Sequence, residues 1–253
     1  MLDKERFRRA LARVIGEEGG APGIGTLAER SLHRTLKYYY EPDGGCHEIE
    51  YLGSVADIKN GEGIVEIQTG SFSRMVEKLR RFLPTARVTV VYPLVTRKRI
   101  KWLDKRTGEL TESGRDVRGK VLADCGRELY AIREFIGHPS LTVRIVSVSA
   151  VDYRYLDGYD ATRKRRATKL NTVPEALTEE LTLSSREDYL SLLPSELGDE
   201  FSAKEFSAVS RSRSRYAYYT LRLLVDLGLL ERYSEGRAYK YKRLKQQGQK
   251  WKQ

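Results

Sequence analysis

The sequence predicts an α/β protein that carries a second, smaller and strongly basic domain at its C-terminal end. Up to about residue 155, hydrophobic patterns of helical period alternate with strand-like patterns, which is typical of α/β domains. A length of 253 residues is enough for one large domain or two ordinary ones. Positive charge gathers at one end, because residues 211–253 hold twelve Lys and Arg against three acids, or +9 of the net charge of +11.

Two helices and three short strands are predicted in the first third of the chain. Asp3 can cap a helix in which Phe7 and Leu11 recur at helical spacing, and a pair of glycines ends it. After a second helix over residues 26–38, the period changes to that of strands separated by glycines. We expect these strands over residues 47–52, 55–59 and 64–69.

The middle of the chain continues this alternation. In order, we expect a basic helix over residues 72–82, strands over 88–92 and 99–103, a polar loop over 104–120, a helix over 127–136 and a long β run over 141–155. Residues 159–184 are expected as a linker or connecting segment. The predicted domains are therefore residues 1–158 and 185–253.

The C-terminal domain has the pattern of two helices followed by a hairpin. Ser202 and Glu205 have the spacing of a capping box at the start of a short helix. A longer helix over residues 212–227 carries apolar residues on one face. Glu235-Gly236 then marks the turn of a basic hairpin.

With residues 188–193 as a first helix, the segment 185–244 resembles the winged helix-turn-helix superfamily. The resemblance implies that the longer helix enters the major groove of double-stranded DNA N-terminus first, while the hairpin, or wing, contacts the backbone or the minor groove. The expected DNA-binding residues are Arg213, Arg215, Tyr216, Tyr219, Arg237, Lys240 and Lys242. A solubilising basic tail and a winged domain used for protein contacts are the alternatives.

Composition argues against several classes of protein. No apolar run approaches the ~20 residues that span a bilayer, and the N-terminus lacks a signal-peptide pattern, so we expect a cytoplasmic protein without membrane contact. Cys46 and Cys125 are far apart and solitary, which fits reduced thiols rather than a disulfide or a zinc site. His47 and His138 are expected to be structural.

The second and third strands hold the sharper functional hypothesis. If Asp57 lies opposite Glu66, then Lys59 lies opposite Ile64 and residues 60–63 form a four-residue loop. Side chains alternate between the two faces of a sheet. In this register one face is apolar, with Ala56, Ile58, Val65 and Ile67, and the other gathers Asp57, Glu66 and Gln68.

Two carboxylates directly opposite each other on a sheet repel and destabilise it. A divalent cation that bridges them reverses the sign of this interaction, and oxygen ligands of this kind suit Mg²⁺ or Mn²⁺. Such an ion can activate water and neutralise a phosphoryl group. The pair Asp57 and Glu66 therefore predicts a metal site for phosphodiester chemistry. In the alternative interpretation, Asp57 only caps the following turn.

Helical Glu29, then Asp57, then Glu66-Ile67-Gln68 on a following strand resemble the PD-(D/E)XK nuclease superfamily over residues 26–94, including its order of helix, three strands, helix and strand. The resemblance implies a restriction-endonuclease-like mixed sheet flanked by helices. It also implies that Asp57, Glu66 and Glu29 hold the metal. His33, one turn after Glu29, is expected at a helix interface.

Gln68 stands where that superfamily carries a lysine. A neutral amide can orient water but cannot offset the charge that develops on the phosphate. Lys59, or Lys78 on the next helix, is expected to replace the lysine.

The leading prediction is thus a metal-dependent DNA endonuclease targeted by a winged helix. The alternatives are an inactive nuclease fold that binds DNA as a regulator or defence-system component, and a winged-helix adaptor. Preference for DNA over RNA and formation of a homodimer stay open.

Overall fold

The computed structural model describes residues 2–17, 31–114, 116–155, 168–236 and 238–244. The chain divides into two compact units, and each combines separate parts of the sequence. Unit 1 holds residues 1–70, 81–120 and 142–182, and unit 2 holds residues 71–80, 121–141 and 183–253.

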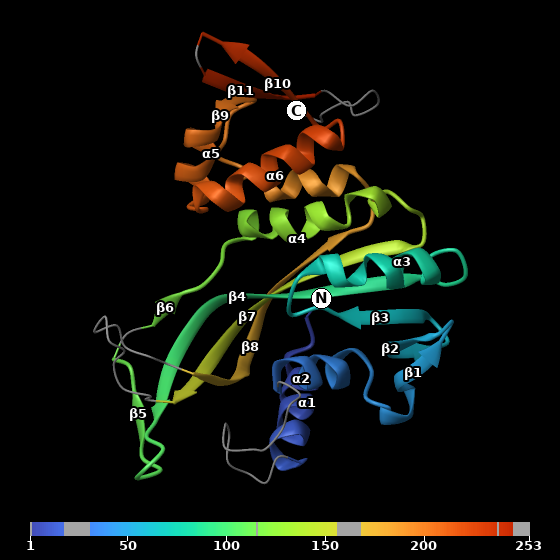
Figure 1. The fold of residues 1–253 in the computed structure, drawn as a ribbon, viewed down its shortest axis with the longest axis vertical. Coiled ribbons are helices and arrows are strands. Elements are labelled where there is room, and N and C mark those ends of the chain that lie inside the picture. Colours follow the sequence, from blue (N-terminus) through green and yellow to red (C-terminus); the bar gives the residue numbers. More distant parts are fainter. Residues whose placement is uncertain (1, 18–30, 115, 156–167, 237, 245–253) are drawn as a thin grey trace. The chain divides into compact units, whose positions relative to one another are not determined.

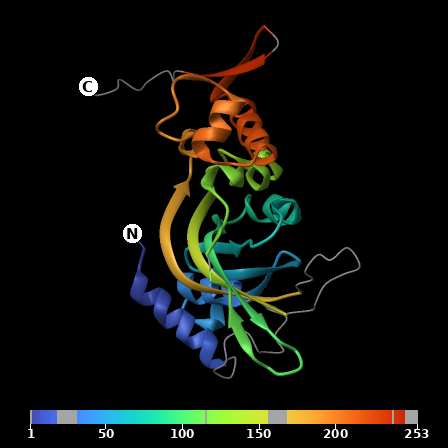
Figure 2. The ribbon, with the colours of Figure 1, turned by 90° about the vertical axis from the view of Figure 1, so that its left-hand side faces the viewer.

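Within the described residues, unit 1 is built on a mixed sheet of eight strands (Figure 1). The path through the sheet is β1 (His47–Tyr51), β2 (Ser54–Asn60), β3 (Gly63–Ile67), β4 (Val88–Leu103), β7 (Leu141–Tyr155) and β8 (Lys169–Leu183). The first three strands form an antiparallel meander, whereas β3 and β4 run parallel. Strands β7 and β8 run side by side and curve together (Figure 2).

The chain between β3 and β4 holds a 3₁₀ turn, η2 (Phe72–Met75), followed by helix α3 (Val76–Phe82). A parallel pair of strands needs such a crossover connection, because the chain must return to the end of the sheet at which the first strand began. The predicted order of helix, three strands, helix and strand is therefore confirmed in the chain.

Helices α1 (Lys4–Glu17) and α2 (Ser31–Tyr40) pack against one face of this sheet. Their buried side chains form a single apolar cluster with the strands, including Phe7, Leu32, Leu36, Ile58, Ile67 and Val91. The predicted cap of α1 is confirmed, because the Asp3 carboxylate accepts hydrogen bonds from the backbone N–H groups of Glu5 and Arg6.

Two predictions about the later strands are wrong. Strand β4 runs without a break from Val88 to Leu103, although its polar centre predicts two separate strands. Its outer half is held by β5 (Leu110–Glu112) and β6 (Val117–Arg118), which lie in the expected loop and pair with it. Residues 169–183, expected in a linker or connecting segment, form β8, because Val173 and Leu177 bury their side chains in unit 1.

The C-terminal part of unit 2 is an antiparallel three-stranded sheet with helices. Its elements are β9 (Glu200–Ser202), α5 (Ala203–Ser210), α6 (Ser214–Asp226), β10 (Leu230–Glu235) and β11 (Ala238–Arg243), and the sheet order is β10-β11-β9. The predicted capping box is confirmed, since Ser202 and Glu205 exchange side-chain and backbone hydrogen bonds at the start of α5.

Helix α6 also packs against an earlier part of the chain, η3 (Leu122–Cys125) and α4 (Gly126–Ala131). The Thr220 hydroxyl donates to the Ala123 carbonyl at 2.6 Å, and the Ser212 hydroxyl donates to the Asp124 carboxylate at 2.6 Å. The predicted helix over residues 127–136 comprises α4 and a 3₁₀ turn, η4 (Arg133–Phe135).

The segment expected as the first helix of the C-terminal domain, residues 188–193, is a 3₁₀ helix, η5 (Glu187–Leu192), rather than an α-helix. Among the described residues, no helix combines the length and the apolar character needed to cross a bilayer.

Gly126 lies where α4 and α6 approach closely. A Cβ atom at this position would lie 2.0 Å from Thr220 Oγ1 and 2.5 Å from the Thr220 backbone. We expect Gly126→Ala to lower the free energy of unfolding by about 1–3 kcal/mol, because the helices must move apart. Gly16→Ala on α1 is the matched control, since nothing lies within 4 Å of its added Cβ. The control should gain up to ~1 kcal/mol from helix propensity. Urea unfolding measures both changes, and equal stability of Gly126→Ala and wild type would contradict this packing.

Candidate functional site

The predicted register of the β2–β3 hairpin is confirmed, because Ile58 pairs with Val65 and Lys59 with Ile64. The predicted four-residue loop is wrong, since Asn60 and Gly63 also pair and leave a two-residue turn. Two local features allow this tighter turn. The Asn60 side chain accepts a hydrogen bond from the Glu62 N–H at 2.9 Å, and Gly63 adopts a φ of +138°, which only glycine tolerates readily.

Asp57 and Glu66 lie where the ladder between β2 and β3 ends. Beyond the Ile58–Val65 pair, side chains replace the backbone pairing. The Ile67 N–H donates to Asp57 Oδ2 at 2.7 Å, and the Asp57 N–H donates to Glu66 Oε1 at 3.4 Å. The two strands therefore exchange carboxylate contacts at this point, and the two acids come together as the register predicts.

Both carboxylates are shielded from water. The Asp57 side chain is 20% exposed, and Glu66 is 4% exposed. His33 on α2 reaches the same place, with Nε2 3.2 Å from Asp57 Oδ2. His33 thus joins α2 to the strand that carries Asp57, and a protonated imidazole there would partly offset the carboxylate charges.

The donor set suits a hard divalent cation that keeps water ligands. Mg²⁺ is commonly held by one or two carboxylates together with waters and substrate phosphates. Two acids from adjacent strands meet that requirement. In the ranges that the structure describes, no group of three or more His, Cys, Asp or Glu side chains is arranged to hold a metal. Glu29, the predicted third ligand, lies outside the described residues.

Gln68 directly follows the last residue of β3, two positions after Glu66. Its backbone N–H donates to the Val91 carbonyl of β4 at 2.9 Å, which fixes the chain immediately after β3. The side chain is half-buried.

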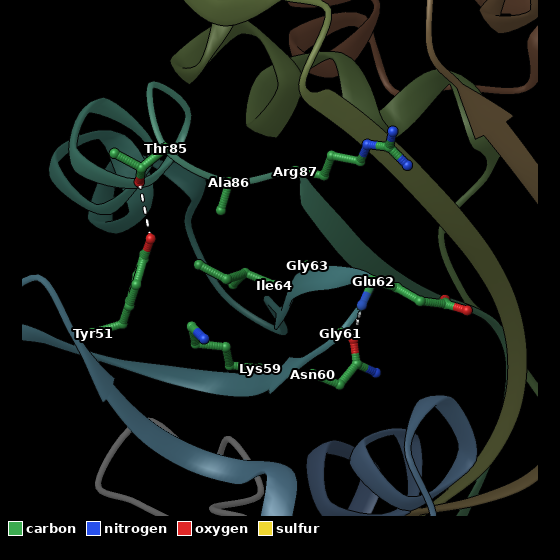
Figure 3. A pocket seen from close by; sticks show the side chains of 10 residues that line it. All are labelled: Tyr51, Lys59, Asn60, Gly61, Glu62, Gly63, Ile64, Thr85, Ala86 and Arg87. Atoms are coloured by element: carbon green, nitrogen blue, oxygen red, sulfur yellow. Dashed lines mark hydrogen bonds between the residues drawn. The ribbon is translucent and has the colours of Figure 1, made fainter.

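Lys59 reaches into a pocket of about 720 Å³. Figure 3 shows its side chain in the space between Tyr51 and Ile64, whereas the Arg87 side chain is directed away. Lys59 Nζ lies 5.0 Å from the centre of the Tyr51 ring, and the Tyr51 hydroxyl donates to Thr85 Oγ1 at 3.2 Å. Because alternate residues of a strand share a face, Lys59 emerges on the same face as Asp57. Lys78, the other predicted cation, belongs to unit 2.

The predicted DNA-binding residues of unit 2 fall into three groups. Arg213 and Arg215 are exposed at the start of α6, and neither forms an ion pair with a described residue. Tyr216 and Tyr219 are half-buried, and the Tyr219 ring packs 6.0 Å from that of Tyr130.

The third group lies on the β10–β11 hairpin, where acids already pair with both lysines. Lys240 pairs with Glu235, and Lys242 pairs with Glu200. These hydrogen bonds raise the pKa of both lysines. Arg237 lies outside the described residues.

Sequence analysis missed two outward-facing residues of α6. Tyr218 is 48% exposed, and Arg222, one turn later, donates a hydrogen bond to the Tyr218 hydroxyl at 3.0 Å. The helical period was a sufficient signal, because the core stripe of Ala217, Leu221 and Leu224 leaves positions 218 and 222 directed outward.

The comparisons with known proteins cover mainly unit 1. Residues 30–184 match a family described as a domain of unknown function, DUF8091. A protein of Treponema pallidum (strain Nichols), described as uncharacterized, is 34% identical over 126 residues. The similar region covers 49% of this chain and 50% of that protein, so this chain matches about half the length of its relative. No solved structure matches the chain.

The site predicts that Mg²⁺ or Mn²⁺ stabilises the folded protein through Asp57 and Glu66. A ligand that binds only the native state raises its melting temperature by mass action. We expect Asp57→Asn to abolish this rise. Glu62→Gln removes an exposed acid from the turn of the same hairpin and should leave the rise intact. Thermal unfolding with and without the metal measures the effect, and an undiminished rise in Asp57→Asn would place the metal elsewhere.

Proposed function

The chain belongs to the DUF8091 family, and we propose that it is a divalent-metal-dependent DNA endonuclease. In this proposal Asp57 and Glu66 hold the metal and unit 2 binds DNA. The observation that carries the proposal is the convergence of two shielded carboxylates where the β2–β3 ladder ends. A divalent cation between the two carboxylates would offset their mutual repulsion, so the pair supports a metal site.

The surrounding elements support a restriction-endonuclease-like core. Helix α2, strands β1 to β3, helix α3 and the parallel strand β4 follow the order of the PD-(D/E)XK superfamily that the sequence resembles. Mg²⁺ or Mn²⁺ bound at the acids would supply an activated water and neutralise charge on the phosphodiester.

The residues of the chain have separate tasks in this site. The Ile67 N–H and His33 hold the Asp57 carboxylate in one orientation. Lys59 offers positive charge from the same strand, in place of the lysine that Gln68 replaces. Gln68 can orient water by hydrogen bonding.

The arrangement of unit 2 supports a winged helix-turn-helix. Helices α5 and α6 are joined by a short turn, and the β10–β11 hairpin follows them and pairs with β9. Arg213 and Arg215 place two exposed cations at the start of α6, the end that enters the major groove in that superfamily.

A second candidate is a DNA-binding protein that does not cut. It is favoured by Gln68 and by the contacts that Asp57 already makes. One oxygen of Asp57 meets both the Ile67 N–H and His33, so protein groups compensate part of the charge that a metal would otherwise neutralise. Carboxylates held in this way can be stable in a protein that has no catalytic activity.

Cleavage of supercoiled and linear duplex DNA with Mg²⁺ or Mn²⁺ separates these candidates. We expect wild type to cut and both Asp57→Asn and Glu66→Gln to lose about 10²-fold or more in rate, because each removes charge stabilisation from the reacting phosphate. Lys59→Ala should also cut slowly, with duplex affinity little changed. Glu62→Gln is the matched control and should cut normally. DNA binding without cleavage under either metal would favour the second candidate, and cleavage that survives loss of both acids would refute the proposed site.

Duplex binding should depend steeply on salt through the start of α6. We expect Arg213→Gln and Arg215→Gln each to reduce the slope of log affinity against log salt by about 0.9, the value for one lost phosphate contact. Arg80→Gln is the control, because Arg80 already pairs with Glu77 and Glu134. Fluorescence anisotropy across a salt series gives the slopes. Unchanged slopes in both α6 variants would rule out these arginines as phosphate ligands.

A further inference from the structure

Unit 2 carries a surface on which tyrosine rings and guanidinium groups alternate, and we propose that this surface stacks the unpaired bases of a single-stranded nucleic acid. The inference rests on the proposed function, because it adds unpaired bases to the duplex DNA that unit 2 is proposed to bind. We call this set the aromatic–arginine surface, and it comprises Tyr130, Arg133, Tyr218, Arg222, Arg232 and Tyr239.

The first half of the surface joins α4 and α6. The Tyr130 ring has two guanidinium groups near its face, with Cζ of Arg133 at 4.3 Å and Cζ of Arg222 at 5.6 Å from its centre. Arg222 also donates to the Tyr218 hydroxyl at 3.0 Å. The Tyr219 ring lies 6.0 Å from Tyr130 and 5.6 Å from Tyr218, so the rings and cations form one continuous series.

The second half lies on the β10–β11 hairpin. Cζ of Arg232 lies 4.6 Å from the centre of the Tyr239 ring. Tyr241 lies opposite Arg232 across the hairpin, and Tyr239, two residues earlier on β11, shares its face of the sheet. Helix α6 packs against β10 of the same hairpin, so the two halves belong to neighbouring elements.

Packing within unit 2 does not account for this surface. Tyr218 and Tyr239 are 48% and 56% exposed, whereas Tyr189 and Tyr241 of the same unit are buried. Exposed rings of this size forgo the free energy of burial and commonly mark binding sites. In the described part of the chain, no acid forms an ion pair with Arg222 or Arg232, so positive charge accompanies the exposed rings.

Single-stranded nucleic acid matches this chemistry. Cationic grooves follow its backbone while aromatic side chains stack on its bases, and stacking contributes about 1–3 kcal/mol per base without sequence readout. In an intact duplex the base faces are covered by their neighbours, so an exposed tyrosine has no face to stack on. The surface therefore favours a single strand, or a duplex with an unpaired end or gap.

The test compares affinities of the full chain for a labelled oligothymidine strand and for a duplex of equal length, by fluorescence anisotropy. Tyr218→Leu and Tyr239→Leu keep apolar bulk but remove the ring, whereas Tyr218→Phe and Tyr239→Phe keep the ring. We expect each Leu variant to lose about 5- to 150-fold in affinity for the single strand, which corresponds to one stacked base. The Phe variants should bind like wild type, and duplex affinity should change little in all four.

Tyr155→Leu is the matched control, because Tyr155 is a tyrosine of unit 1 that also carries a cation over its ring, Lys105 at 4.4 Å. It should bind the single strand normally. Stacking should also quench part of the tyrosine fluorescence of the wild type, which gives a second readout.

Several outcomes would overturn the inference. Equal losses in Phe and Leu variants would assign the effect to the Tyr hydroxyls, and equal losses on duplex and single strand would make the surface a duplex contact. If heparin at matched charge displaced the single strand completely, charge attraction alone would explain the binding. Duplex binding without single-strand binding would refute this inference alone, whereas binding to neither would refute the proposed function as well.

Discussion

The hydrogen bond from the Ile67 N–H to the Asp57 carboxylate holds together the point where β2 and β3 part. Ile67 is buried, pairs with Val91 of β4 and lies in the apolar cluster beneath α1 and α2. An unsatisfied N–H in that position would cost about 1–3 kcal/mol. The same carboxylate therefore closes a gap in the sheet and faces Glu66, so the chemistry of the candidate site and the integrity of the sheet share one side chain.

That sharing also explains why His33 belongs to the site. Helix α2 buries Leu32 and Leu36 in the cluster, which fixes its rotation about its own axis and directs His33 toward Asp57. Packing on one side of the helix thus determines which polar group arrives on the other. A substitution in the apolar face of α2 would therefore move His33 relative to Asp57, although the substituted residue does not contact the carboxylates.

The parts of the structure that follow local rules could be predicted from the sequence. Strict alternation of apolar and polar residues fixed the register of Ile58 against Val65, and the Ser202–Glu205 spacing located the start of α5. The parts that failed depend on partners far away in the chain. The polar centre of β4 is extended because Arg97 pairs with Arg118 and Lys98 pairs with Val117. The local sequence pattern does not predict such contacts.

The contact between Thr220 and Ala123 bridges 97 residues, and it limits how this protein can be divided. The region that matches the family, residues 30–184, contains η3 and α4 but ends before α6. A chain cut there would remove the Thr220 hydroxyl from the Ala123 carbonyl and the Ser212 hydroxyl from the Asp124 carboxylate, and α4 would lose its packing against α6. Each unit is assembled from separate stretches of the sequence, so a cut at one position in the chain does not separate them. A homologue that has only the matched region must cover α4 in another way, for example with a different appended segment or a neighbouring subunit.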